Sequence, residues 1–511
     1  MSDPQVLVVG AGPTGLVLAL WLARRGIAVR IIDKVAEPGT TSRALAIQAR
    51  TVEFYRQLGV ADDVVARGLP FHTVNLWDWG RPIGRAEFGV IGAGLTPFPH
   101  ILIFPQDQHE RLLIEHLHRA GVEVERPAEL LGFDADGDAV VARIRHLGGD
   151  VETCRAGYLA GCDGARSIVR EGLGVGFPGG TYDRVFYVAD AQVHGPIANH
   201  ELHVALDDAD FFAAFPLKGE GAVRLIGTVR RESEAEERQL TWDDVSRRAV
   251  QRMAITAERI NWFSTYRVHH RVAKQFRRGR VFLVGDAAHV HSPVGGQGMN
   301  TGIGDAMNLA WKLAEAATNP GAASILDSYE PERMAFALKL VASTDRAFTF
   351  VTRDGAIARF VRRRVFPLVL PWLTARASVR RFMFRTISQT RIRYRSSALS
   401  EGHAGSIHGG DRLPWVPPAS GEANDNFTSL ASMDWQVHVY GEAAAELVQA
   451  CAGRNLPLHA FTWRDAMRAP GLARNAGYLI RPDGYVAVAG VDAGSLGKYF
   501  DRQCITMRAR P

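Results

Sequence analysis

Residues 281–316 read VFLVGDAAHVHSPVGGQGMNTGIGDAMNLAWKLAEA, an apolar segment, a glycine-rich segment and a helical pattern in succession. Four apolar residues, 281–284, predict a buried strand, and a helical pattern begins near Met299. The loop between them is rich in glycine and proline, so its backbone amides can approach a flat, partly anionic group. The helix would direct its positive N-terminal end at the same place. Asp286 follows the strand end, where open α/β sheets bind ligands.

Any strand–loop–helix connection uses glycine and proline, so these residues could belong to a plain connection. Here the acid, the paired glycines and the helix occur together and in order. We therefore interpret the stretch as a ligand-binding motif.

The composition is that of a soluble globular protein. The chain has 511 residues, 47% hydrophobic and 22% charged, which suggests roughly two to four domains. No apolar run reaches the roughly 18 residues of a membrane span, and no signal peptide precedes the first strand. The four cysteines form no CxxC pair, which predicts a reducing cytoplasm and no structural metal.

The formal net charge is +6, and arginines concentrate in residues 353–395. Such a segment could bind an anionic membrane or a nucleic acid. We favour the alternative, a solvated helical face or arginines paired with acidic residues elsewhere, because Pro367 and Pro371 interrupt the apolar part. We therefore expect no nucleic-acid partner and no stable membrane insertion.

A second motif lies at the N-terminus, where residues 5–33 predict a strand, a helix and a second strand. In this dinucleotide-binding fingerprint Gly10 makes the tight turn, Gly12 lets a pyrophosphate approach, and Gly15 lets the helix pack on the strand. Asp33 lies about 20 residues on and can accept a hydrogen bond from a ribose hydroxyl. The motif alone does not choose between NAD and FAD.

Further polar residues follow along the chain. Arg43 and Arg50, at the start of another predicted helix, could neutralise a pyrophosphate. Gln106 begins a helix and could reach back towards a cofactor, and Asp163 stands at a strand end in the segment GCDGARSIVR. Residues 175–275 then contain strand-length apolar segments, which predict a sheet that covers the site and lines a pocket.

The C-terminal part predicts a small α/β unit. A segment rich in Gly, Ser, Pro and Asn, 396–428, is expected to be a linker. A strand, a helix and another strand follow, and a hairpin is turned by Arg481-Pro482-Asp483-Gly484. The unit lacks the cysteine pair that a redox-active version would need.

Three segments, GAGPTG, GCDGARSIVR and the long 281–316 motif, together resemble the single-component FAD-dependent aromatic hydroxylases, the family of para-hydroxybenzoate hydroxylase and phenol hydroxylase. This resemblance covers roughly residues 4–345. The C-terminal unit is similar to the thioredoxin-like domain of members that act on phenols, hydroxyphenylpropionates and polyketides. The implied fold is α/β, with a Rossmann-type FAD-binding domain, an inserted mixed β-sheet substrate domain and a C-terminal thioredoxin-like α/β domain.

The FAD-binding domain is expected in two parts, 1–174 and 276–395, the second with further helices. The substrate domain is expected at 175–275, between these parts, and it is followed after the second part by the linker at 396–428 and the thioredoxin-like domain at 429–511.

The resemblance implies non-covalent FAD and NADPH or NADH as reductant. The residues it places around FAD are Gly10, Gly12 and Gly15 at the pyrophosphate, Asp33 at the ribose, Arg43 and Gln106 beside the FAD chain, Asp163 at FAD and the pyridine nucleotide, Asp286 at the ribityl chain, and Gly298, Met299 and Asn300 at the flavin ring. Pro293 would place a backbone carbonyl near the reacting ring. Family members more often carry Glu where this chain has Asp33.

The implied reaction is hydroxylation of a phenolic or polyketide-like aromatic by a flavin C4a-hydroperoxide formed with O2. Tyr182, His100 and His203 are candidates for contacting a substrate hydroxyl, and none is assigned. His289 and His291 are interpreted as structural. One alternative keeps the cofactor but gives epoxidation, Baeyer–Villiger oxidation or oxidative decarboxylation. Another is a flavin-binding protein without turnover that acts at a membrane or partner, and the C-terminal unit could mediate a homodimer.

Overall fold

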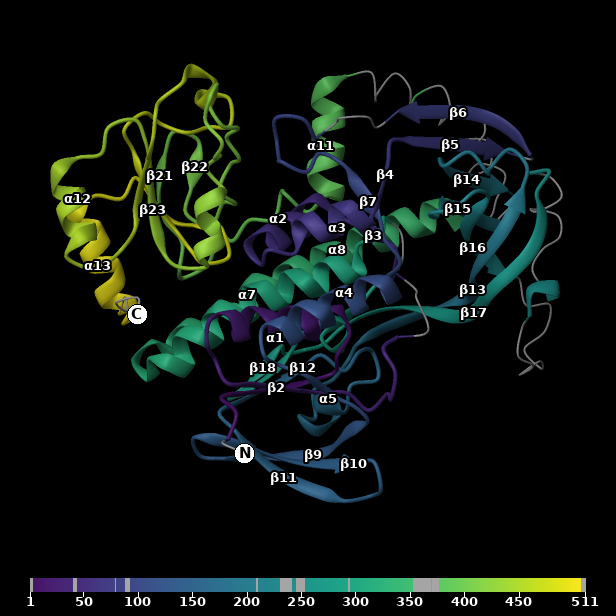
Figure 1. The fold of residues 1–511 in the computed structure, drawn as a ribbon, viewed down its shortest axis with the longest axis horizontal. Helices are drawn as coiled ribbons and strands as arrows, with labels where there is room; N and C mark the ends of the chain where they lie inside the picture. The colour runs from purple at the N-terminus through teal and green to yellow at the C-terminus, as the bar shows by residue number, and fades with distance from the viewer. Residues whose placement is uncertain are drawn as a thin grey trace.

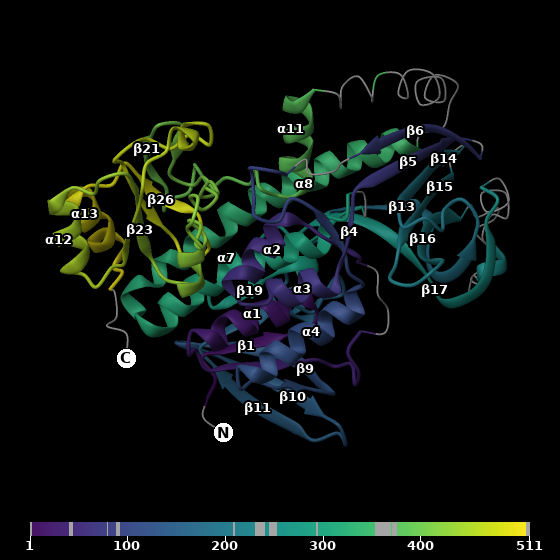
Figure 2. The same cartoon turned by 45° about the horizontal axis from the view of Figure 1, so that its top comes forward.

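The computed structural model describes residues 3–39, 44–78, 80–87, 92–207, 210–229, 241–244, 253–292, 295–352, 369 and 376–506. The protein is α/β, with a parallel sheet, a large mixed sheet and a C-terminal unit (Figure 1). The long helix α7, Gly298–Thr318, runs from beside the C-terminal unit to the centre of the molecule, as both ribbon views show (Figure 2).

The parallel sheet has the strand order β18-β19-β12-β1-β2-β8. Its strands are β1 (Val6–Val9), β2 (Val29–Ile32), β8 (Val124–Glu125), β12 (Tyr158–Gly161), β18 (Arg277–Arg278) and β19 (Val281–Leu283). All neighbours pair in parallel except the edge strand β18. Strands β1, β12 and β19 are buried throughout, because helix α1 (Pro13–Arg24) packs against β1, while strand β10 (Ala139–His146) and helix α5 (Ile168–Gly172) pack against β12.

Helix α1, Pro13–Arg24, begins with proline at its first turn, where a missing backbone N–H costs nothing. Its apolar residues are buried on all sides, since it packs against β1 and β2 and against the helices α4 (Gln106–Arg119) and α7. This arrangement fixes the N-terminal end of α1 beside the beginning of α7.

The mixed sheet has the order β20-β17-β13-β16-β15-β14-β5-β6. Its strands are β5 (Thr73–Asp78), β6 (Arg81–Glu87), β13 (Gly179–His194), β14 (Leu202–Asp207), β15 (Asp210–Pro216), β16 (Ala222–Val229), β17 (Thr256–Val272) and β20 (His289–Val290). Strands β5 and β6 come from the chain well before residue 175, so the sheet draws on more of the sequence than the segment predicted for it. Phe212 is buried in its core, whereas Phe211 and Phe215 are half-buried on the other face.

The other elements lie around these two sheets. They are β3 (Ala46–Ile47), β4 (Leu69–Phe71), β7 (Ile101–Ile103), β9 (Ala128–Asp136), β10 (Ala139–His146), β11 (Val151–Ala156), α2 (Ala49–Gln57), α3 (Ala61–Arg67), α5 (Ile168–Gly172), α8 (Tyr329–Thr352), α11 (Ala377–Ile387) and the short 3-10 helices η1 (Trp242–Asp244), η2 (Gly285–Ala287) and η3 (Pro320–Ser328).

The C-terminal unit is built on a sheet of order β22-β21-β26-β25-β23-β24. Its elements are β21 (Glu401–Ala404), β22 (Ile407–His408), η5 (Thr428–Ser432), β23 (Gln436–Tyr440), α12 (Ala445–Ala452), β24 (Leu458–Phe461), η6 (Asp465–Arg468), β25 (Gly477–Ile480), β26 (Val486–Ala489) and α13 (Ala493–Gln503). Strands β21 and β22 belong to the segment predicted as a linker, and Glu401 pairs with Val488 of β26. The domain boundaries themselves stay predictions.

A buried ionic cluster, here called the junction cluster, joins the C-terminal unit to helices α7 and α8. It consists of Lys312, Glu332, Arg481 and Asp483, each at most 1% exposed. Arg481 donates to both carboxylate oxygens of Glu332, at 2.8 and 3.0 Å, and Lys312 Nζ lies 2.9 Å from Glu332 Oε2. The predicted turn at 481–484 is therefore anchored in the interior of the molecule.

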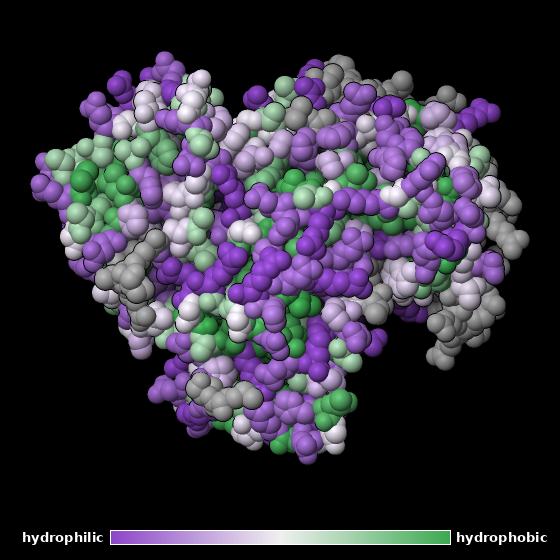
Figure 3. All heavy atoms as spheres, in the orientation of Figure 1, coloured by the Kyte–Doolittle hydropathy of each residue, from purple (hydrophilic) through white to green (hydrophobic). Residues whose placement is uncertain are grey.

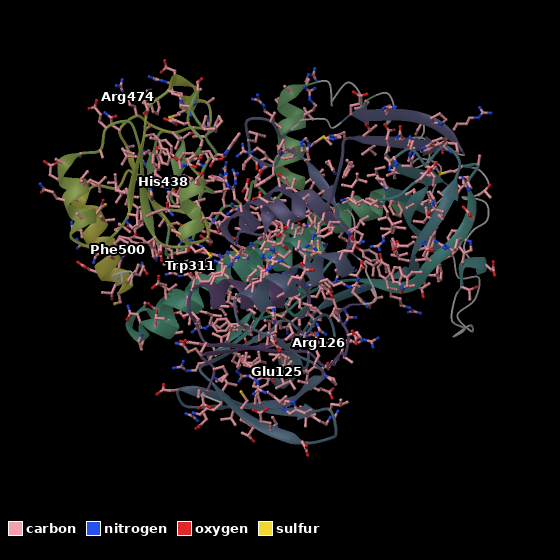
Figure 4. All side chains as sticks on the ribbon, in the orientation of Figure 1. Glu125, Arg126, Trp311, His438, Arg474 and Phe500 are labelled. Carbon is pink, nitrogen blue, oxygen red and sulfur yellow. The ribbon has the colours of Figure 1, made fainter. Side chains whose placement is uncertain are left out.

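Aromatic packing continues the junction on the side of α7 that faces the C-terminal unit. Trp311 donates its indole N–H to Asp483 Oδ2 at 3.1 Å and packs edge-on against Trp435, 5.4 Å away between ring centroids. Trp435 in turn packs against Phe500 of α13, 5.7 Å away between ring centroids, and Figure 4 labels Trp311 and Phe500. Apolar and ionic contacts thus hold α7 to the C-terminal unit together.

Hydrophilic side chains cover most of the face in Figure 3, and apolar ones gather in smaller groups. In the described part of the chain no helix is both long and apolar enough to cross a membrane. Of the arginine-rich segment, 353–368 and 370–375 lie outside the described residues. Arg393 and Arg395 pair with Asp411 at 3.3 and 2.7 Å, which agrees with arginines neutralised by acidic residues elsewhere.

Candidate functional site

The three sequence motifs meet at one edge of the parallel sheet. Val9 pairs with Gly161, and Gly161 pairs with Leu283, so β1, β12 and β19 end side by side. Backbone hydrogen bonds carry this register into the loops, since Cys162 N donates to the Val9 carbonyl at 2.7 Å and Val284 N to the Gly161 carbonyl at 3.0 Å. The loops after the three strands therefore form one continuous surface.

Gly10, Gly12 and Gly15 shape the first loop. Gly10 has φ +103°, and a Cβ there would overlap the Cys162 carbonyl of the second loop. A Cβ on Gly15 would overlap the carbonyl oxygen of Gly10, so the helix can pack this closely only without a side chain. At Gly12 a Cβ would meet no atom of the described residues within 4 Å. The backbone is tightly packed at Gly10 and Gly15, whereas the space beside Gly12 is open and could hold a pyrophosphate.

Asp33 closes the first loop from the end of β2. Its Oδ2 accepts from Ala11 N at 2.7 Å and its Oδ1 from Val35 N at 2.9 Å. The guanidinium of Arg126 lies 3.5 Å from Oδ1. Each carboxylate oxygen has two lone pairs, so Asp33 keeps acceptor capacity for a ligand hydroxyl.

Arg126 is a site residue that the sequence interpretation missed, and no local pattern marks it. It donates to the carbonyl of Val35 at 2.9 Å and to that of Ala11 at 3.3 Å, so it binds the loop and the chain after Asp33 together (Figure 4). Its guanidinium contacts the carbonyl of Ala11, the residue before Gly12, so its positive charge lies next to the open part of the loop.

Gln106 and Glu110 bind the backbone of Ala44 and of Gly39, the residues on either side of 40–43. Gln106 Oε1 accepts from Ala44 N at 3.1 Å, and its amide donates to Glu110 Oε1 at 2.8 Å. Glu110 Oε2 accepts from Gly39 N at 3.0 Å, and burial raises the pKa of Glu110. Glu110 was not predicted, although its position four residues after Gln106 on α4 would have indicated it. Arg43 itself lies outside the described residues.

Asp163 stands in the second loop, with its Cα next to Gly10. Its Oδ2 accepts from Val169 N at 3.1 Å, whereas its Oδ1 is buried without a hydrogen-bond partner among the described residues. Burial raises the pKa of this carboxyl. A buried acceptor without a donor is costly, so the position favours a ligand that supplies one.

The third loop follows β19. Gly285 has φ +63°, and a Cβ there would lie 2.8 Å from the hydroxyl of Thr14 on α1. A Cβ on Gly302 of α7 would overlap the same hydroxyl. These glycines let the loop, α1 and α7 converge, and they leave the side chain of Asp286 exposed at the sheet edge. Pro293 lies outside the described residues.

Gly298, Met299 and Asn300 form the first turn of α7. The Asn300 side chain is fully engaged within the chain: its amide donates to the carbonyls of Ala46 and Gly296 at 2.8 and 2.9 Å, and its oxygen accepts from Gln48 N and the Thr51 hydroxyl at 2.9 and 2.7 Å. It therefore ties α7 to the start of α2. The backbone N–H groups of the first helical turn have no intrahelical partner and can bind a ligand.

The candidate histidines bond to groups of the chain. His289 Nε2 lies 2.6 Å from Asp305 Oδ2, which agrees with a structural role. His203 accepts from the Trp77 indole at 3.0 Å, and burial lowers its pKa to about 4. His291 bonds through Nδ1 to the Ser292 carbonyl at 2.8 Å, and burial lowers its pKa to about 4 as well. The Tyr182 hydroxyl donates to Asp345 at 2.5 Å.

Comparison with known proteins agrees with this geometry. A family model described as an FAD binding domain matches residues 3–344. The chain is 32% identical to 6-methylpretetramide 4-monooxygenase of Streptomyces rimosus, over 97% of this chain and 92% of that protein. It is 31% identical to pentachlorophenol 4-monooxygenase of Sphingobium chlorophenolicum, over 69% of this chain and 66% of that protein.

A solved structure, the anhydrotetracycline hydroxylase from Streptomyces rimosus, has a TM-score of 0.78 at 27% identity and covers 97% of this chain and 98% of its own. Fold, site and matches together define a flavoprotein monooxygenase. The chain belongs to the single-component FAD-dependent aromatic hydroxylase family, which confirms the resemblance carried by the three motifs.

Asp33→Asn should weaken FAD binding by about tenfold or more, because hydrogen bonds to a charged group contribute roughly 1.5–3 kcal/mol. The variant loses the charge that pairs with Arg126. FAD titration into apoprotein, followed by flavin fluorescence, measures the change. Asp62→Asn is the matched control, since Asp62 is exposed on α3. Equal dissociation constants for Asp33→Asn and the wild type would contradict the role assigned to this carboxylate.

Proposed function

We propose that this enzyme uses NADPH or NADH and O2 to hydroxylate a phenolic or polyketide-like aromatic compound. The observation that carries the proposal is the convergence of three loops and the first turn of α7 at one edge of the parallel sheet. That edge offers room for a pyrophosphate at Gly12 and free backbone amides at the start of α7.

FAD fits the residues at this edge. Gly12 would lie along the pyrophosphate, Asp33 would accept from the ribose, and the buried Oδ1 of Asp163 would accept from a donor group of FAD or of the pyridine nucleotide. Asp286 would contact the ribityl chain, and the amides of 298–300 would meet the flavin ring. When bound, FAD supplies the redox chemistry, taking a hydride from the pyridine nucleotide and activating O2 for transfer of one oxygen atom to the substrate.

The chain contributes electrostatics at the flavin. The positive end of α7 and its free amides would stabilise the negative charge that a reduced flavin carries. Asn300 would keep this turn in place through its four hydrogen bonds. The carbonyl of Pro293 would lie near the reacting ring, as expected from the family motif.

The mixed sheet would supply the side of the site that binds an aromatic substrate. One of its faces carries half-buried aromatic side chains around a small apolar core, namely Tyr182, Phe211, Phe215, Trp262 and Tyr266. Such side chains offer apolar area together with ring-to-ring contacts for a polycyclic ligand. The relatives named for methylpretetramide, anhydrotetracycline and pentachlorophenol support a phenolic or polyketide-like substrate.

Anaerobic reduction of the bound flavin tests the proposal. NADPH or NADH is mixed with the holoenzyme in the absence and presence of phenols, phenylpropionates and polycyclic quinols, and loss of the oxidised flavin absorbance is followed. We expect one compound class to accelerate reduction, since substrate binding in such enzymes can gate the conformational step before hydride transfer. A flavin that neither nucleotide reduces with any compound would contradict the proposal and favour a binding protein without turnover.

Product analysis separates hydroxylation from the alternatives that share the cofactor. Mass and NMR spectra of the product distinguish a new ring hydroxyl from an epoxide, a ring-inserted oxygen or loss of CO2. A hydroxylated ring is the expected result, and any of the others would correct the reaction type while leaving the FAD site in place.

A further inference from the structure

Helix α7 carries a buried carboxylate, that of Asp305, about two turns after its N-terminal end. Asp305, fully buried on that helix, accepts from Arg333 Nε at 2.5 Å and pairs with His289 at 2.6 Å. It also accepts from the backbone N–H of Gly285 at 3.1 Å. One carboxylate thus contacts the third loop of the site, a strand of the mixed sheet and helix α8.

Arg333 connects this carboxylate to the first turns of α7. It is 1% exposed, and its Nη2 donates to the carbonyl of Thr301 at 3.1 Å. Its Nη1 donates to the hydroxyl of Tyr394 at 2.8 Å, and the Tyr394 ring packs against Tyr485 of the C-terminal unit, 4.5 Å between centroids. The guanidinium therefore donates to three groups, on Asp305, Tyr394 and Thr301, and two of these residues belong to α7.

Both partners are charged at neutral pH. Burial alone would lower the pKa of Arg333, but its contacts with Tyr394 and Asp305 outweigh burial and raise it. Burial alone would raise the pKa of Asp305, but Arg333 and His289 outweigh it and lower it. The Arg333 cation and the Asp305 anion are thus held at different positions near the N-terminal part of α7. The field of each is weakly screened because neither touches solvent.

We propose that Asp305 and Arg333 are positioning residues that set the reduction potential of the bound flavin with opposite signs. The inference rests on the proposed function, since it needs the flavin at the first turn of α7. Reduction adds negative charge to the flavin, so the Arg333 cation favours the reduced form and the Asp305 anion opposes it. Their hydrogen bonds to Gly285 and Thr301 hold the charges in register with the site.

The two neutralising variants should move the potential in opposite directions. Asp305→Asn keeps the side-chain shape and leaves the Arg333 cation uncompensated, so the potential rises. Arg333→Gln leaves the Asp305 anion uncompensated, so the potential falls. We expect a change of about tenfold in the reduction equilibrium for each, which is about 30 mV for a two-electron couple. The double variant should return towards the wild type.

The measurement is a reductive titration of each purified holoenzyme against reference dyes, together with FAD affinity from fluorescence. If the pair were purely structural, both variants would bind FAD more weakly, and their reduction potentials would not move in opposite directions. Shifts in the same direction, or none in either variant, would overturn the inference. Asp327→Asn, which removes an exposed carboxylate paired with Arg277, is the matched control and should leave the potential unchanged.

Two further results keep the test decisive. If Arg333→Gln does not fold, Arg333→Lys keeps the positive charge beside Asp305, and its potential must stay close to that of the wild type while Asp305→Asn raises it. A clear fall in the potential of Arg333→Lys, or no rise in Asp305→Asn, would overturn the inference. If the wild-type protein itself binds no FAD, the proposed function fails, a result distinct from bound FAD with an unchanged potential.

Discussion

Gly15→Ala should lower FAD affinity by about 100-fold and destabilise the fold as well. A Cβ on Gly15 would overlap the carbonyl oxygen of Gly10, a backbone atom that cannot rotate away. Helix α1 must then shift from the first loop, at a cost near the upper end of overpacking penalties, ~3 kcal/mol. Fluorescence titration with FAD and thermal unfolding of the apoprotein measure the two effects.

Gly12→Ala is the informative companion variant. A Cβ at Gly12 meets no atom of the described residues within 4 Å, and Gly12 has φ −75°, which alanine adopts readily. We therefore expect wild-type thermal stability together with a loss of FAD binding, because the methyl group would take the space of the pyrophosphate. Gly494→Ala, at the start of the remote helix α13, controls for the substitution itself. Normal FAD binding by Gly12→Ala would contradict the assigned pyrophosphate position.

The second large effect is expected at the junction cluster. Glu332→Gln should destabilise the protein by about 3–5 kcal/mol, the usual result of removing one member of a buried ion pair. Glu332 accepts from Arg481, Lys312, and the polar side chains of Asn308 and Ser397. Asp483 still pairs with Arg481 in the variant, so one net positive charge stays buried without a counter-charge. Chemical denaturation followed by tryptophan fluorescence measures the loss, since Trp311 lies in the junction.

An exposed ion pair provides the control for that prediction. Glu401 of β21 pairs with Arg502 of α13, and both side chains are more than a third exposed. Exposed pairs contribute about 0–1 kcal/mol, so Glu401→Gln should change the denaturation midpoint little. Equal losses in the two variants would show that the junction cluster does not hold the C-terminal unit in place.

The sequence predicted those parts of the molecule that are encoded locally. Gly10, Gly12, Gly15 and Asp33 lie within one short unit whose spacing follows from strand and helix geometry, so their convergence could be derived. The turn at 481–484 was predicted from its residues in the same way. The depth of that turn was not, because its burial depends on Glu332, which is distant along the chain.

Pairings between distant segments escaped prediction for the same reason. Strand β5 joins the mixed sheet by pairing Val74 with Leu202, and nothing near residue 74 indicates this partner. In the site, Arg126 reaches the first loop from the end of another strand. Asn300 is still predicted to face the flavin ring, but its side-chain bonds to Ala46, Gln48 and Thr51 could not be predicted, because those residues are distant along the chain.

The origin of the oxygen atom in the product tests the central claim most directly. The compound that accelerates flavin reduction is converted by the holoenzyme with a reduced pyridine nucleotide under ¹⁸O₂, and the product is examined by mass spectrometry. The account predicts one labelled oxygen atom on the aromatic ring, none from water, and no product without the nucleotide. An unlabelled product, or turnover without flavin, would contradict it.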